Sequence, residues 1–487
     1  MSTSTLPQPA RPTFGVEIEL LIAVRSESDN SEDPYANVEG LPPILRAPDN
    51  DFNYDRGESY TLDRVEAFLD RYFQDSPFGA PLTSVASRRK ALINLNPSAG
   101  LSRYEKWQAV VDVSVEAVSD RSCSWCGFLV SAITNEFRCR INDTCGLHVH
   151  VGTLADRLSL DQVRRFAAIS YAAEPLLFTL FDPVRRLNKY SMALRDHSLI
   201  ANRVELTEDL MYHSPPPEMS DSWLCHRYPG RDRRHGEPPM SSRDSDEAQN
   251  EISAFLKTRE PGHFEPFIPT GEPEHTEESP DDLPHEPDPG VNRKLLPLTD
   301  PAERPRKRNI PRFRLPNYYE PGGFQALAYA LGELATYWDD LETRGPGPGV
   351  FEATQRIFSR PSSCYIAREL MCPYCPSISF RHYDCVNLSG PSSCSVEFRL
   401  AEASLDGQWI ATWAKICCGL LKFALNASPS DFIGLLTNCD RADREDGSYD
   451  VVDLLDDLGL FAEAEIVEKR LVANMDWWRL EFAEPKS

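Results

Sequence analysis

The sequence predicts an α+β fold in which helices cover an antiparallel sheet. Short segments at 15–24, 147–151 and 395–400 carry apolar residues at every second position, the pattern of half-buried strands. Longer segments carry apolar residues at helical spacing. Helices and strands do not alternate as regular βαβ units, which favours α+β over a doubly wound parallel sheet.

Five segments have helical spacing. The segment 158–181 opens with Ser159 and Gln162, which match the Ser-x-x-Gln capping box at a helix start. The other predicted helices lie at 60–73, 323–342, 404–425 and 457–472.

Composition sets the class of partner that we expect. The 487 residues are 41% hydrophobic, enough for a sizeable core, and 51 basic against 75 acidic residues give a net charge of -24. Such an acidic surface repels nucleic-acid phosphates and anionic lipid. We therefore expect no nucleic-acid and no membrane partner, while substrates bound through a metal ion stay compatible with the charge.

Targeting signals and cysteines indicate the compartment. The first residues lack the pattern of a signal peptide, and no apolar run approaches the ~20 residues of a membrane span. The 13 cysteines are scattered, which favours reduced thiols and a cytoplasmic location. The Cys-x-x-Cys pairs at 123/126 and 372/375 suggest zinc, although chance spacing is the simpler explanation.

The chain divides into two predicted blocks, 13–213 and 318–482, around an insert at 214–317. Gly271–Gly290 within the insert holds eight acidic residues and five prolines, too little apolar surface to offset the entropy of ordering. We expect the insert and residues 1–12 to be disordered, and residues 483–487 to form a tail. The basic run at 304–314 suits a nuclear-import signal, a docking strip or a plain solvated linker.

Three predicted strands carry pairs of polar residues two positions apart, so each pair shares one face of its strand. Glu17 and Glu19 form the first pair, within Phe14–Leu20 (FGVEIEL). His148 and His150 form the second, between Gly146 and Gly152, and Glu397 and Arg399 form the third. The apolar residues of all three strands take the opposite face.

Any one of these strands also fits an ordinary half-buried strand with its polar side toward water. Two successive outward histidines are less ordinary, and the three pairs together suit a metal ion and phosphate. Carboxylates bind hard cations, imidazole is a nitrogen ligand, and a guanidinium pairs with phosphoryl oxygens.

These residues resemble the amidoligase family, whose members are ATP-dependent carboxylate–amine ligases related in fold to glutamine synthetase and glutamate–cysteine ligase. The resemblance is carried by FGVEIEL, by NDTCGLHVHVG (142–152) and by the segment 383–413, which includes VEFR. WQAVVDVSV (107–115), RRLNKY (185–190) and RHYDCVN (381–387) are similar to further family segments.

The resemblance implies a glutamine synthetase-like antiparallel sheet with helices packed on one face. It implies Mg²⁺, or Mn²⁺, and ATP as cofactors, and a small-molecule or peptide carboxylate and an amine as substrates. By analogy with glutamine synthetase, one of the two histidines binds metal and the other touches the nucleotide. The implied roles are metal ligation by Glu17, Glu19, His148 and Glu397; catalysis by Arg399, His150 and Glu19; and cofactor binding by His150, Arg399, Arg185, Arg381 and Asn387.

The sequence departs from the family in one place. The family has a strand of the type Val-Glu-Leu-Val-Ser-Pro and then a helix before the His-x-His strand. The segment 126–133 (CGFLVSAI) is the expected counterpart of that strand, with Phe128 in place of the glutamate, and the spacer up to 141 is too short for a helix. We therefore expect one carboxylate and one helix to be missing, with Glu116 or Glu136 as substitutes for the carboxylate.

Two other functions fit the sequence. A family member that has lost catalysis and serves as a binding or scaffold protein fits Phe128, the short spacer and the long acidic insert. A metal-dependent hydrolase fits the histidines and carboxylates alone. Cys145 could be a nucleophile beside His148, but a small buried cysteine is the simpler interpretation, and His382 is expected to be a surface or packed residue.

Overall fold

The structure is a computed structural model. It describes residues 12–49 without 34, 107–117, 123–141, 145–153, 157–206, 310–331 without 321, 344–384, 395–444 and 447–476, together with parts of 64–71, 335–341 and 478–482. The chain divides into a larger unit, residues 1–213 with 296–487, and a second unit, residues 214–295. All described residues belong to the larger unit. Asn387 and nearly all of the predicted insert lie outside them.

The main sheet is built around β1. Its strands follow the order β2-β1-β5-β8-β7, and β3 and β4 also pair with β1. Every pairing is antiparallel except that of β1 with β2. The strands of this sheet are β1 (Thr13–Ser26), β2 (Leu45–Ala47), β3 (Trp107–Ala117), β4 (Cys139–Arg140), β5 (Gly146–Gly152), β7 (Ile378–Ser379) and β8 (Val396–Glu402). A separate two-stranded sheet contains β6 (Phe313–Arg314) and β9 (Glu481–Phe482).

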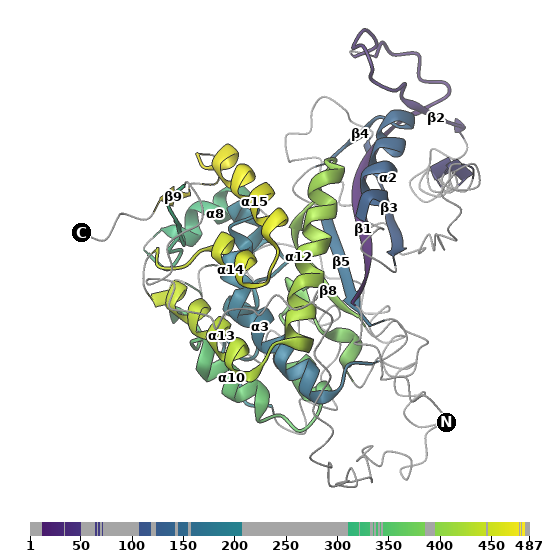
Figure 1. The fold of residues 1–487 in the computed structure, drawn as a ribbon. Coiled ribbons are helices and arrows are strands. Elements are labelled where there is room, and N and C mark those ends of the chain that lie inside the picture. Colours follow the sequence, from purple (N-terminus) through teal and green to yellow (C-terminus); the bar gives the residue numbers. More distant parts are fainter. Residues whose placement is uncertain are drawn as a thin grey trace, which may run out of the picture. The chain divides into compact units, whose positions relative to one another are not determined.

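Helices make up most of the remaining described chain (Figure 1). They are α2 (Cys123–Glu136), α3 (Leu160–Phe178), α4 (Leu194–His197), α8 (Gly323–Leu331), α10 (Val350–Phe358), α11 (Ser363–Glu369), α12 (Gly407–Asn426), α13 (Pro429–Arg444), α14 (Val451–Asp457) and α15 (Phe461–Asn474), with 3₁₀ turns η3 (Pro183–Leu187) and η6 (Arg381–Tyr383). The predicted capping box is present at the start of α3. Among the described residues, no helix is long and apolar enough to cross a membrane.

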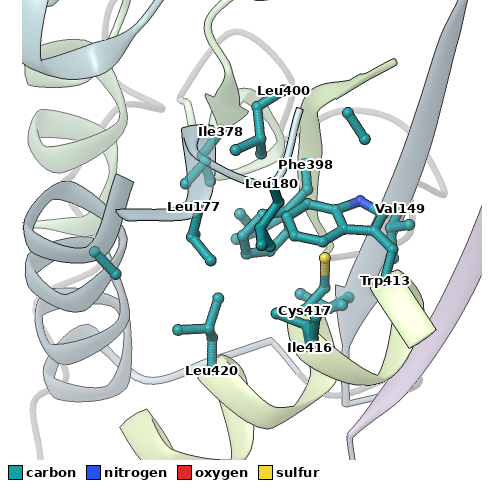
Figure 2. Packing of buried hydrophobic residues seen from close by; sticks show 14 of the residues in the cluster. Val149, Leu177, Leu180, Ile378, Phe398, Leu400, Trp413, Ile416, Cys417 and Leu420 are labelled. Carbon is teal, nitrogen blue, oxygen red and sulfur yellow. The ribbon is translucent and has the colours of Figure 1, made fainter. Parts of the chain in front are cut away.

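The apolar face of the sheet packs on α3 and α12. Figure 2 shows Val149 of β5 and Phe398 of β8 against Trp413 of α12. The rings of Phe398 and Trp413 meet edge to face at 6.1 Å, and Phe166 of α3 lies 6.1 Å from Phe398. Burial of these large side chains fixes the strand register, because a slip of one residue would turn every polar pair into the core.

The α+β prediction is confirmed as a sheet-and-helix fold, and the three strands with polar pairs are present as β1, β5 and β8. One expectation was wrong. Residues 126–133 are not a strand, and the helix before the His-x-His strand is not missing, because Cys123–Glu136 forms α2. A short apolar run fits a strand and a buried helix equally well, and here its length of 14 residues with the flanking turn makes a helix.

The end of the predicted insert is ordered. Phe313 and Arg314 form β6, which pairs with β9 next to the C-terminal tail. Phe313 is buried, and its backbone N–H donates to the Asp450 carboxylate at 2.9 Å. Arg312 pairs with Asp453 at 2.7 Å. The second block therefore begins before residue 318.

Candidate functional site

The strand register brings the predicted polar pairs together. Glu17 of β1 stands opposite His148 of β5, and His150 of β5 stands opposite Glu397 of β8. The residue opposite His150 on β1 is Gly15, which has no side chain. Glu17 can therefore reach diagonally to His150 as well as directly to His148.

Three of these side chains form a cluster with the spacing of a metal site. One ligand atom each from Glu17, His150 and Glu397 lie within 4.8 Å of one another. Nε2 of His150 is 3.1 Å from Oε1 of Glu17 and 3.8 Å from Oε1 of Glu397. Glu397 is 1% exposed, so its carboxylate is removed from bulk water and depends on partners within the site.

His148 lies beside this triad and joins it to Glu19. Its Nδ1 is 3.3 Å from Oε2 of Glu17 and 3.6 Å from Oε1 of Glu397, and its Nε2 is 3.7 Å from Oε1 of Glu19. The backbone N–H of Gly146 donates to Oε2 of Glu19 at 2.6 Å. The four predicted metal ligands and His150 thus share one face of three adjacent strands.

Arg399 supplies the positive charge of the site. Its Nη1 forms an ion pair with Oε1 of Glu397, two residues before it on β8. Its Nε donates to the carbonyl of Tyr190 at 3.3 Å, and its backbone N–H donates to the carbonyl of Ser377 at 2.6 Å. These contacts hold the guanidinium at the edge of the carboxylate cluster.

The environment keeps the central carboxyls ionised. Burial opposes the charge on Glu17, but hydrogen bonds from His148 and His150 and their charges hold its pKa well below the ordinary value. Burial likewise opposes the charge on Glu397, yet the charge of Arg399, followed by that of His150, lowers its pKa to about 2. Burial lowers the pKa of His150, and the bond to Glu17 and the charge of Glu397 outweigh it and raise that pKa.

Two residues that sequence reasoning did not place in the site border it. The ring of His382, in η6, meets the ring of His150 edge to face with the centroids 6.2 Å apart. The hydroxyl of Ser395 lies 3.2 Å from Nδ1 of His150. Ser395 directly precedes the Val-Glu-Phe-Arg motif, but no sequence pattern distinguishes it from an ordinary strand-end serine.

The remaining predicted cofactor residues have different surroundings. Arg185 is buried in η3, and its Nη2 donates to the carbonyls of Arg399 and Ala401 at 3.1 and 3.2 Å, so it supports the edge of β8. Arg381 opens η6 next to His382 and is partly exposed. Asn387 lies outside the described residues.

The cysteines that the structure describes stay outside the carboxylate–histidine cluster. Cys145 is buried and packs with Leu21 and Ala403. Among the described residues, Cys372 and Cys375 form no disulfide, and Cys372 is buried with its thiol 3.7 Å from the carbonyl oxygen of Met192. Within the described residues, the group that could hold a metal ion contains no cysteine.

Glu116 and Glu136, the residues expected to substitute for the missing carboxylate, lie in a strand and a helix respectively. Glu116 of β3 pairs in register with Gly15, which itself pairs with His150. Glu116 thus occupies the row of the sheet that contains His150 and Glu397. Glu136 is the last residue of α2.

Comparison with known proteins relates the chain to one family. The sequence model of a family described as "putative amidoligase enzyme" matches residues 102–262. The match confirms the predicted resemblance to the amidoligase family. It includes His148, His150 and Arg185, and the other site residues lie outside it. The amidoligase match implies an enzyme of the ligase type. No curated protein and no solved structure matches the chain.

The donor set fits a divalent cation. Two carboxylates and one imidazole are ligands that Mg²⁺ and Mn²⁺ accept, with Mn²⁺ more tolerant of nitrogen. Three carboxyl groups, from Glu17, Glu19 and Glu397, lie near one guanidinium, and when the two imidazoles are neutral a cation would offset the remaining negative charge. The residues present therefore fit the metal that an amidoligase implies.

Proposed function

We propose that this protein is an ATP- and Mg²⁺-dependent carboxylate–amine ligase. The observation that carries the proposal is the cluster of Glu17, His150 and Glu397 with Arg399 paired to Glu397. It places ligands for a divalent cation beside a fixed guanidinium, the combination that phosphoryl transfer uses. The amidoligase match supports a ligase rather than another ATP-dependent reaction.

In the proposed reaction, a carboxylate oxygen of the substrate forms a bond to the γ-phosphorus of ATP, and the bond to the β,γ-bridging oxygen breaks to release ADP. The amine nitrogen then attacks the acyl carbon, loses a proton and displaces phosphate, leaving an amide. A bound divalent cation neutralises the charge on the phosphates.

The chain's own residues orient the reactants and balance charge. The guanidinium of Arg399 contacts the carbonyl oxygen of Tyr190 and the carboxylate of Glu397, which would keep it in place while charge moves between phosphate oxygens. His150 and Glu397 stand opposite each other on paired strands, which fixes the ligand spacing in the backbone. The glutamine synthetase-like relationship is part of the proposal and rests on the same strands.

A family member that has lost catalysis is the alternative for which Phe128, the short spacer and the acidic insert are the reasons. The spacer no longer supports it, because α2 is a helix that precedes the His-x-His strand. Phe128 belongs to α2, so it does not stand at a strand position where a carboxylate would be expected.

The test is ADP release by the full chain with Mg²⁺, ATP and pools of carboxylates and amines. We expect ADP and amide to form together, and Glu397→Gln and Arg399→Ala to lower the rate at least 100-fold. Matched controls are Glu352→Gln and Arg314→Ala, whose ion pairs are exposed at the surface and which should keep the wild-type rate. No ADP from any pool, or equal rates in all four variants, contradicts the proposal.

A metal-dependent hydrolase is the second candidate, because a triad of one imidazole and two carboxylates also suits a cation that activates water. Metal analysis separates the two candidates. A hydrolase site retains zinc stoichiometrically through purification and works without ATP, whereas the ligase requires added Mg²⁺ and consumes ATP.

A further inference from the structure

Ser395 contacts the side of the His150 ring that faces away from the carboxylates. Its hydroxyl lies 3.2 Å from Nδ1, while Nε2 lies 3.1 Å from Oε1 of Glu17. Ser395 is 6% exposed, so water competes little for this hydrogen bond. The imidazole is held between a hydroxyl on one side and a carboxylate on the other.

The protonation chemistry of imidazole makes this contact informative. A neutral ring that gives the lone pair of Nε2 to a cation carries its proton on Nδ1, and that buried N–H needs an acceptor. A ring that instead donates Nε2–H to Glu17 has a lone pair on Nδ1 and needs a donor there. A hydroxyl can accept or donate, whereas a carbonyl can only accept.

We propose that Ser395 is a positioning residue for the metal site: its hydroxyl, in hydrogen-bond contact with Nδ1, fixes the His150 ring with Nε2 toward Glu17 and Glu397. The inference rests on the proposed metal site. The His382 ring also lies against the His150 ring, with the centroids 6.2 Å apart, and the Ser395 hydroxyl contacts it within hydrogen-bond distance.

The test compares Mn²⁺ affinity at one fixed pH, measured by electron paramagnetic resonance of free Mn²⁺ with the full chain. We expect Ser395→Ala to weaken binding roughly 10- to 100-fold, the usual effect of removing such a partner. Ser395→Thr keeps the hydroxyl, so its Mn²⁺ affinity should stay within about threefold of wild type. That change is smaller than the one expected when the hydroxyl is removed.

Ser379→Ala is the matched control. Ser379 is 1% exposed and pairs in register with Glu397, and within the described chain its hydroxyl has no hydrogen-bond partner. Its removal should leave Mn²⁺ affinity unchanged. If Ser395→Ala does not fold, Ser395→Cys replaces it, since a thiol of similar size is a weak donor and acceptor.

A metal-free measurement separates this inference from the proposed function. The ¹⁵N shift of His150 Nδ1 in the labelled chain should change in Ser395→Ala and return toward wild type in Ser395→Thr. An unchanged shift, or Mn²⁺ affinity equal to wild type in Ser395→Ala, overturns the role of Ser395. Absence of Mn²⁺ binding by the wild-type chain instead overturns the proposed function, whatever the shift shows.

Discussion

Glu397 stands opposite His150 where β8 pairs with β5, and the same carboxylate forms an ion pair with Arg399. One buried carboxylate thus joins the metal-ligating side of the site to its cationic side. Because Glu397 is almost fully buried, it needs a positive partner whether or not a metal ion is bound.

Removal of Arg399 should therefore be partly compensated by metal. Without metal, Arg399→Ala leaves Glu397 buried beside Glu17 and should lower the free energy of unfolding by about 3–5 kcal/mol. Saturating Mn²⁺ should stabilise this variant more than it stabilises wild type, because the cation takes over the missing charge. Urea unfolding with and without Mn²⁺ measures the difference.

Arg314→Ala is the control for that experiment. Its ion pair with Glu481 is at least half exposed on both sides and should contribute less than about 1 kcal/mol. Equal Mn²⁺ stabilisation of Arg399→Ala and Arg314→Ala would contradict a shared role of metal and Arg399.

Gly146 should not tolerate a side chain. A Cβ at this position would lie 2.6 Å from Nε2 of His148 and 3.2 Å from Oε2 of Glu19. We expect Gly146→Ala to displace His148, to cost about 1–3 kcal/mol of stability and to weaken Mn²⁺ binding. Thermal unfolding and Mn²⁺ titration check both effects.

Gly349→Ala is the control for Gly146→Ala. The nearest atom to its Cβ would be Oδ1 of Asp440 at 3.6 Å, an ordinary contact. If both alanine variants bind Mn²⁺ like wild type, the close approach at Gly146 has no importance for the site.

Arg186 should act in folding rather than at the metal site. Its guanidinium pairs with both oxygens of Asp196 at 2.7 and 2.9 Å, and Asp196 is completely buried. Arg186→Ala should lower the free energy of unfolding by about 3–5 kcal/mol. Mn²⁺ affinity of the folded variant should stay at the wild-type value, and a loss of affinity at unchanged stability would refute this assignment.

Glu174 should give stability a pH dependence. Its carboxylate is fully buried in α3, accepts hydrogen bonds from the N–H groups of Leu194 and Arg195 and from the hydroxyl of Ser377, and burial raises its pKa to about 7. A folded pKa above the unfolded value means that its contribution is complete below about pH 4.5 and is lost as the pH rises to about 7. The loss is on the order of 3 kcal/mol.

Glu174→Gln removes the titration and should flatten the curve of unfolding free energy between pH 4.5 and 7. The glutamine amide has one acceptor oxygen where the carboxylate has two, so the absolute stability also changes. The comparison therefore concerns the slope of unfolding free energy against pH. Urea unfolding at a series of pH values checks it, and identical slopes in both proteins would show that Glu174 is ionised throughout.

The period-two pattern predicted the parts of the site that lie in long strands. Glu17, His150 and Glu397 are in β1, β5 and β8 because apolar residues on the other face of each strand pack on α3 and α12. The sequence could place these residues on one face of the sheet, but it could not say that His150 would lie closer to Glu17, at 3.1 Å, and His148 closer to Glu397, at 3.6 Å.

The site residues that the sequence did not predict are brought to the site by tertiary contacts. His382 and Ser395 reach His150 from a 3₁₀ turn and a strand end, and neither has a local pattern. The segment 126–133 is predicted as a strand because it resembles the family's Val-Glu-Leu-Val-Ser-Pro strand, and its nearly continuous apolar run has no periodicity that separates a strand from a buried helix.

The most direct test of the account is an anomalous difference map from crystals of the full chain grown with Mn²⁺. We predict a peak between the carboxylates of Glu17 and Glu397, within coordination distance of Nε2 of His150. No peak among these residues, or a peak bound only elsewhere on the chain, would contradict the proposed site.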